Sequence, residues 1–296
     1  MGHVQSPTPG SPGLWLTGPD RWISDPALSW IISVAASCAI GFMMALVNRV
    51  FNLLRTVSVA FVGYFMVMQA ATPTALTGFD GGELLAMMAL VGMALLYSVY
   101  QEPRITQRIF LLFFLLAAGS VVEYGFALYI PVFLLGCYQM RVLVPRVVIA
   151  AVVGLITPVW ILWGFGVIDP TRIIIPAMPD PASIFSRPEA IPQAVSVGLT
   201  LIAGLYFGSA NTIKVIALNA RSRAFNGLLS AIGVFTGLLC ILDFTNVAFY
   251  VTLLNACTAM QAGLYMKLYA TRRAYAPVLA VLACYVAVFI WHTWLI

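Results

Sequence analysis

The chain has 296 residues, of which 62% are hydrophobic and only 8% are charged, and its formal net charge is +5. Ordinary soluble domains carry about 25% charged residues, so this chain has too little polar surface to be a soluble globule. Its basic residues are scattered between apolar runs, which argues against a nucleic-acid-binding module. The composition therefore predicts an all-α, polytopic helical membrane protein whose main partner is the lipid bilayer.

Residues 1–27 form a polar segment, rich in Gly and Pro, before the first apolar run. The segment lacks the basic stretch that opens a secretory signal, so we expect the first apolar run to remain as a membrane span. The five cysteines all fall in apolar segments, and the chain has only two histidines, His3 and His292. This scarcity of ligands predicts no metal site and no cofactor held by imidazoles or thiolates.

Ten apolar runs are candidates for membrane spans. Each crossing of a hydrocarbon core about 30 Å thick needs roughly 17 to 25 apolar residues. The runs are 28–47, 56–71, 83–100, 109–123, 125–140, 147–166, 193–213, 224–242, 245–266 and 276–295. The two runs within 109–140 are short for membrane spans, so the alternative is that they form a re-entrant hairpin. That hairpin would leave eight full crossings.

The charges sort between alternate loops, and this sorting predicts the topology. Basic residues in short loops mark the cytoplasmic side, and most of the 15 basic residues fall in one set of loops, whereas nearly all the acids fall in the other. Arg108 and Arg141 must share a side, as must Arg223 and Lys267, so each ambiguous stretch crosses an even number of times. We therefore expect both termini outside the cytoplasm, and all seven tryptophans fall at that outer interface.

The longest connection, 167–192, contains six prolines and divides the chain into a six-span part, 28–166, and a four-span part, 193–296. Repeated prolines remove backbone donors and prevent a regular helix, so we expect an irregular extracytoplasmic loop. In the four-span part, two G-x-x-x-G pairs, Gly204 with Gly208 and Gly233 with Gly237, are typical of faces on which membrane helices pack closely.

Candidate chemistry is confined to the outer surface, because no Asp, Glu, Lys or Arg lies near the middle of a predicted span, where such groups usually mark ion pathways. An outer carboxylate can act as a general base on a sugar hydroxyl, and an arginine can hold a diphosphate through paired hydrogen bonds. Tryptophans can offer a flat apolar platform to a sugar or prenyl chain. The catalytic candidates are Glu123, Asp243, Arg172 and Arg187, and the ligand-binding candidates are Trp160, Trp163, Tyr124 and Asn246.

Four segments resemble a known family. They are residues 48–55 (NRVFNLLR), 69–73 (QAATP), 129–141 (YIPVFLLGCYQMR) and 154–166 (GLITPVWILWGFG). These segments are similar to those of uncharacterised multi-spanning inner-membrane proteins of Bacteroidota, over roughly residues 30–270. The resemblance implies a bacterial inner membrane, and it supplies neither an activity nor catalytic residues.

Three functions fit these observations, so whether the chain is an enzyme stays open, as does its oligomeric state. An enzyme or accessory protein acting on lipid-linked glycans or envelope lipids at the outer leaflet would use the outer polar residues. A small-solute transporter or lipid flippase, without a proton-coupling carboxylate, would need a cavity between the six-span and four-span parts. A non-catalytic subunit or scaffold would need a stable protein partner.

Overall fold

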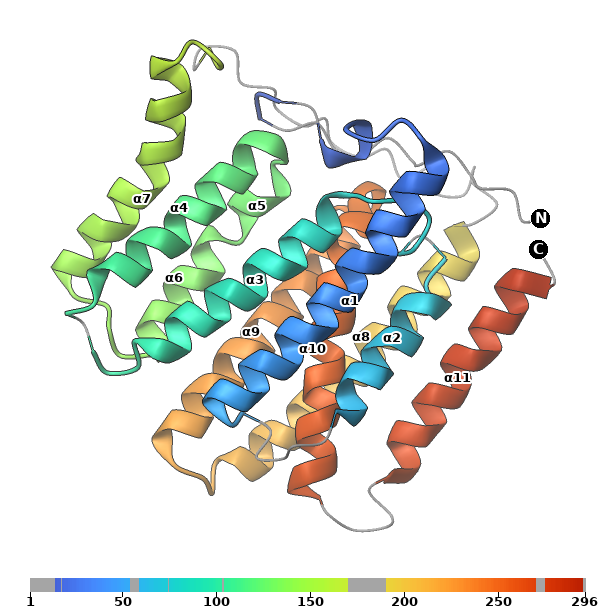
Figure 1. The fold of residues 1–296 in the computed structure, drawn as a ribbon. Helices are drawn as coiled ribbons and strands as arrows, with labels where there is room; N and C mark the ends of the chain where they lie inside the picture. Colours follow the sequence, from blue (N-terminus) through green and yellow to red (C-terminus); the bar gives the residue numbers. More distant parts are fainter. Residues whose placement is uncertain are drawn as a thin grey trace.

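The computed structural model describes residues 14–16, 18–53, 59–73, 75–102, 104–169, 190–269 and 275–294. Every regular element in these ranges is a helix (Figure 1). Two short 3-10 helices are η1 (Pro19–Arg21) and η3 (Phe244–Asn246). The α-helices are α1 (Pro26–Phe51), α2 (Ala60–Ala71), α3 (Gly81–Ser98), α4 (Thr106–Val122), α5 (Gly125–Leu128), α6 (Ile130–Gln139), α7 (Pro145–Gly164), α8 (Ala190–Val215), α9 (Ala220–Leu242), α10 (Val247–Leu268) and α11 (Tyr275–Trp294).

Within the described residues, seven helices are long and apolar enough to cross a membrane: α1, α3, α7, α8, α9, α10 and α11. Three shorter apolar helical units accompany them, namely α2, α4 and the pair α5–α6 over Gly125–Gln139. The chain is therefore a multi-pass α-helical membrane protein, as the composition predicted, because a bilayer requires each backbone polar group to be satisfied within the crossing segment.

Side-chain caps define where several helices begin. Asp25 accepts a hydrogen bond from the Ala27 amide, and Pro26 occupies the first position of α1. The Asn219 side chain accepts from the Ser222 amide at the start of α9. Such caps satisfy amides that have no partner inside the helix, so the polar residues before these helices are fixed at the ends of the bundle.

Helix α10 is the centre of the bundle. It packs against α2, α3, α8 and α9, and nearly all of its residues are buried. Helices α7 and α11 lie at opposite edges (Figure 1), and most of their surface is exposed. Most of their exposed side chains are apolar, as is expected of helices that face lipid.

Two predicted boundaries differ from the structure for reasons that involve proline. The run 125–140 is divided at Tyr129 into α5 and α6. Pro131 follows the break and lacks the N–H that would bond to the Ala127 carbonyl, so the helix cannot continue regularly. Helix α8 begins at Ala190, inside the predicted loop 167–192, because a proline in the first helical turn, here Pro192, is tolerated.

Loops that were predicted to share a side lie together. The Leu14 and Trp15 amides donate to the Ser120 and Val121 carbonyls at the end of α4, and the Trp15 indole donates to the Asp169 carbonyl. At the start of α4, the Arg108 guanidinium donates to the Ser98 carbonyl. Residue 101 also pairs with residue 140 through backbone atoms. The two sets of loops therefore meet at opposite ends of α4.

Candidate functional site

Three of the predicted site residues meet in one cluster. We call Tyr124, Asp243, Asn246 and Tyr250 the outer polar cluster, after the predicted side of the turns that carry it. Tyr124 lies between α4 and α5, Asp243 ends α9, Asn246 belongs to η3, and Tyr250 is in the first turn of α10. The Asp243 carboxylate accepts hydrogen bonds from Tyr124, from Tyr250 at 2.9 Å and from the Asn246 amide at 3.0 and 3.1 Å. The cluster therefore joins the α4–α5 turn to the α9–α10 turn.

The Tyr124 phenol stays protonated, as its hydrogen bond to Asp243 requires. Burial raises the pKa of the Tyr124 phenol above its usual value, and the hydrogen bond to Asp243 and the charge of that carboxylate raise it further. The phenol therefore remains a donor. Asp243 also accepts from the Thr245 hydroxyl at 3.4 Å, so its lone pairs are engaged within the protein. A ligand hydroxyl reaches this carboxylate only by replacing one of these donors.

Glu123 is beside the cluster but points inward. Its side chain is only 2% exposed. A Cβ atom placed on Gly81, at the start of α3, would lie 1.7 Å from the Glu123 carboxylate and 2.9 Å from the Phe249 ring. A larger residue at position 81 would force the Glu123 carboxylate or the Phe249 ring to shift, so glycine permits this close approach. The carboxylate contacts the α3 backbone and is not displayed at the surface.

A second pair of carboxylates, Asp80 and Glu83, begins α3. Glu83 accepts from the Ser33 hydroxyl at 2.6 Å and from the Asp80 amide at 3.1 Å, and Asp80 accepts from the Gly82 amide at 2.7 Å. This is a capping box, which satisfies helix amides reciprocally. Burial is the main cause that raises the pKa of Asp80. The pair holds α3 against α1 and needs no ligand to explain it.

The other predicted site residues are not brought to the cluster. Trp160 and Trp163 are exposed on α7, which packs against α4 and is separated from α9 by other helices (Figure 1). Arg172 and Arg187 lie outside the described residues. Their predicted roles in holding a diphosphate stay predictions.

Buried polar side chains from α2, α8, α10 and α11 form a hydrogen-bond network that connects these four helices. The Asn255 amide donates to Gln69 at 2.9 Å and to Thr72 at 3.3 Å, and its oxygen accepts from Thr200 at 3.2 Å. Gln69 in turn donates to Thr252 at 2.9 Å, and Thr200 bonds the Tyr285 hydroxyl of α11. Hydrogen bonds of this kind connect helices where no hydrophobic force does.

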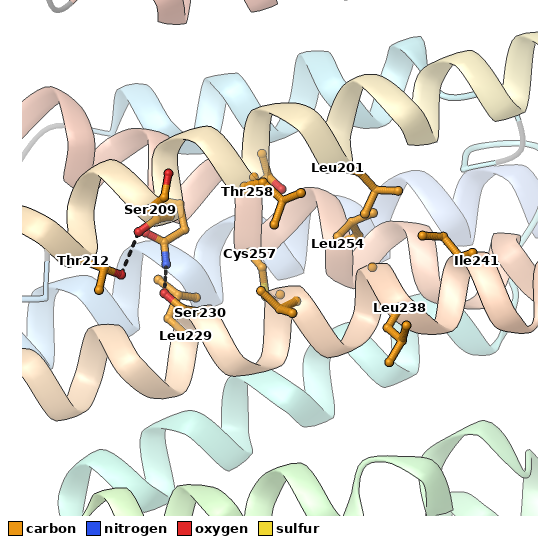
Figure 2. A pocket seen from close by; sticks show the side chains of 17 residues that line it. Leu201, Ser209, Thr212, Leu229, Ser230, Leu238, Ile241, Leu254, Cys257 and Thr258 are labelled. Atoms are coloured by element: carbon orange, nitrogen blue, oxygen red, sulfur yellow. Dashed lines mark hydrogen bonds between the residues drawn. The ribbon is translucent and has the colours of Figure 1, made fainter.

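The four-span part contains a groove of about 430 Å³ between α8, α9 and α10, which we call the α8–α9 groove. Figure 2 shows side chains from all three helices around it. A Cβ on Gly204 would contact Thr258, and a Cβ on Gly237 would contact Leu201, so these glycines do pack closely. A Cβ on Gly208 would meet nothing within 4 Å. The two G-x-x-x-G pairs thus form a packing face only in part and otherwise line an open space.

The groove is apolar along most of its length and polar at one end. Leu205, Val234 and Ile241 border it and are exposed on the bundle surface. At the polar end, the Gln261 amide donates to the Ser230 hydroxyl at 2.9 Å, and the Asn211 amide donates to Gln261 at 2.7 Å. The groove therefore opens sideways, toward the surface that faces lipid.

No protein-family model, curated protein or solved structure matches this chain. The function must therefore be argued from the sites and not from fold.

Two kinds of chemistry are compatible with the described residues. The outer polar cluster offers phenol, amide and carboxylate groups that hydrogen-bond to the hydroxyls of a ligand when that ligand replaces a partner within the cluster. The α8–α9 groove offers a space for a hydrocarbon chain. Among the described residues, no group of three His, Cys, Asp or Glu side chains is placed to hold a metal ion. In the sequence, only the four glycines of the two G-x-x-x-G pairs pointed to the region of the groove.

Proposed function

We propose that this chain is an envelope protein of a bacterial inner membrane that binds a membrane lipid from the side, with one hydrocarbon chain in the α8–α9 groove. The observation that carries this proposal is the lateral opening of an apolar groove between exposed apolar residues such as Leu205 and Val234. In a bilayer, the molecules present at such an opening are lipids, so a lipid chain is the occupant that the surroundings supply.

The dimensions of the groove support a lipid chain. Its volume of about 430 Å³ falls within the range of roughly 300 to 1,000 Å³ found for small-molecule sites. Along α8, the lining runs from Leu201 to Thr212, which is about 16 Å at the rise of an α-helix. That length is close to half of a hydrocarbon core about 30 Å thick, so it matches the chains of one leaflet.

The membrane topology that accompanies this proposal has ten spans with both termini outside the cytoplasm. Seven long helices and three shorter apolar units give ten candidate crossings. The sorting of basic and acidic loops supports the orientation, and the resemblance to inner-membrane proteins of Bacteroidota supports the location.

A tag at the C-terminus should be reached by an impermeant reagent in cells with a permeable outer membrane. Labelling that requires lysis of the inner membrane would refute the orientation.

Filling the groove tests the lipid proposal. Gly208→Leu places a side chain in the groove, and its Cβ meets no neighbouring atom within 4 Å. Gly198→Leu is the matched control, because Gly198 is also on α8 with nothing within 4 Å but does not line the groove. Native mass spectrometry of the purified chain measures the lipid that each protein retains.

We expect the wild-type chain and Gly198→Leu to retain about one lipid that Gly208→Leu loses. Equal lipid content in the two variants would show that the groove is not the binding site. A wild-type chain that retains no lipid would end the proposal.

A second function is favoured by the outer polar cluster. Tyr124, Asp243 and Asn246 converge at one end of the bundle, and their hydrogen-bonding groups suit the hydroxyls of a lipid-linked glycan. On this alternative the chain is an enzyme or accessory protein for an envelope glycan. Asp243→Asn and Tyr124→Phe should then each change the surface polysaccharide. An unchanged polysaccharide in both variants, with normal protein levels, would leave the cluster with a structural role alone.

A further inference from the structure

Arg223 marks one end of the α8–α9 groove. Its guanidinium donates to the Ile216 carbonyl at 3.5 Å, so the side chain crosses from α9 to the end of α8. Arg223 also precedes the groove residue Ser230 by two helical turns, or about 10 Å, and therefore lies on the same face of α9. The arginine is thus beyond the polar end of the groove, in line with it.

Basic residues flank the α8–α9 turn, beyond the polar end of the groove. The first turn of α9 contains Arg221 and Arg223 and no acidic residue. The start of a helix has a positive dipole, which disfavours cations and favours an anion. Arg221 lies 5.2 Å above the Phe225 ring, and Lys214, in the last turn of α8, lies 5.2 Å above the Tyr269 ring. Aromatic rings therefore hold two further cations near the α8–α9 turn.

We infer that the α8–α9 groove binds an anionic phospholipid, with its phosphate at Arg223 and one acyl chain between α8 and α9. This inference rests on the proposed lipid function and names the class of lipid. The guanidinium can form paired hydrogen bonds with phosphate oxygens. The separation of about 10 Å between Arg223 and the groove leaves room for the glycerol and the ester groups. The lipid belongs to the leaflet that surrounds the α8–α9 turn.

The charge of the site selects among the lipids of a bacterial membrane. A zwitterionic headgroup brings an ammonium group next to the Arg223 guanidinium, and these like charges repel. An anionic headgroup such as phosphatidylglycerol has no such group. Each basic residue near a membrane surface contributes about 1 kcal/mol to the binding of anionic lipid, which corresponds to about a fivefold change in affinity.

The test uses the full chain, delipidated in detergent, with phosphatidylglycerol or phosphatidylethanolamine of identical acyl chains. Native mass spectrometry gives the apparent affinity for each lipid. We expect the wild-type chain to bind phosphatidylglycerol more tightly than phosphatidylethanolamine, and Arg223→Gln to lose about fivefold in phosphatidylglycerol affinity. Arg223→Lys, which keeps the charge but not the paired hydrogen bonds, should recover part of that loss.

Arg49→Gln is the control, because Arg49 is a basic residue in the last turn of another helix, α1. It should leave the preference for phosphatidylglycerol unchanged. Equal binding of the two lipids by the wild-type chain, with both lost in Gly208→Leu, would overturn the headgroup assignment while leaving the groove as a lipid site. An equal loss in Arg49→Gln and Arg223→Gln would show a general effect of charge and would also overturn it. Binding of neither lipid would end both proposals.

Discussion

Replacing Gly81 by alanine tests the close contact that places Glu123 inside the bundle. The added Cβ would lie 1.7 Å from one Glu123 oxygen, 2.7 Å from its carboxyl carbon and 2.9 Å from the Phe249 ring. Such overpacking in a well-packed interior costs typically about 1–3 kcal/mol. For a chain of this size, about 2 °C per kcal/mol then gives a fall of roughly 2–6 °C in Tm. Thermal unfolding in detergent, followed by circular dichroism, measures the shift.

Two further variants isolate the cause of that shift. Gly198→Ala is the control, since its Cβ meets nothing within 4 Å, and alanine in a helix interior should raise stability by about 0.5–1 kcal/mol. In a Glu123→Ala background, the cost of Gly81→Ala should fall to about half, because only the Phe249 contact remains. If Gly81→Ala costs the same free energy in both backgrounds, Glu123 does not lie against α3 and the reasoning fails.

The remaining predictions concern the polar groups. Asn255→Leu should lower the free energy of unfolding in mixed detergent micelles by about 2 kcal/mol. The substitution removes three hydrogen bonds between helices, each worth about 0.6 kcal/mol. A loss under about 0.5 kcal/mol would contradict this role of Asn255. The raised pKa of Tyr124 means that the folded chain binds more protons than the unfolded chain above pH about 10. This contribution to stability is therefore complete below pH about 10 and declines as pH rises further, so Tyr124→Phe should show a shallower decline in Tm between pH 10 and 12. Asp243→Asn should lower the pKa of Tyr124, as read from phenolate absorbance, and an unchanged titration would argue against their contact.

Composition was sufficient to predict a multi-pass helical membrane protein, because a chain with so few charged residues has too little polar surface to be a soluble globule. The outer polar cluster was predictable in part. Tyr124, Asp243 and Asn246 each fall in a turn between apolar runs, and turns on one side of a membrane are close together. Tyr250 was missed, although its spacing of four residues from Asn246 places both on one face of a helix. Side-chain direction was not predictable, so the inward position of Glu123 depends on the glycine at residue 81, which belongs to another helix.

The α8–α9 groove shows a different limit of sequence reasoning. A G-x-x-x-G pair indicates a helix face without bulky side chains, but it does not show whether another helix fills the space. Gly204 and Gly237 are approached by Thr258 and Leu201, whereas Gly208 faces an open region. The outcome depends on how α10 holds α8 and α9 apart, and that geometry involves three helices at once.

The central position of α10 has a consequence for biogenesis. Among the seven long helices described, α10 with η3 has the lowest mean hydropathy and the largest buried share. A translocon releases a segment into lipid according to its apolarity, and polar side chains reduce that tendency. Among the described residues, the side-chain partners of Asn255 and Gln261 come from α2, α8 and α9, all of which are synthesised earlier. Insertion of α10 should therefore depend on those helices being already in place, so that the order of synthesis itself assists membrane integration.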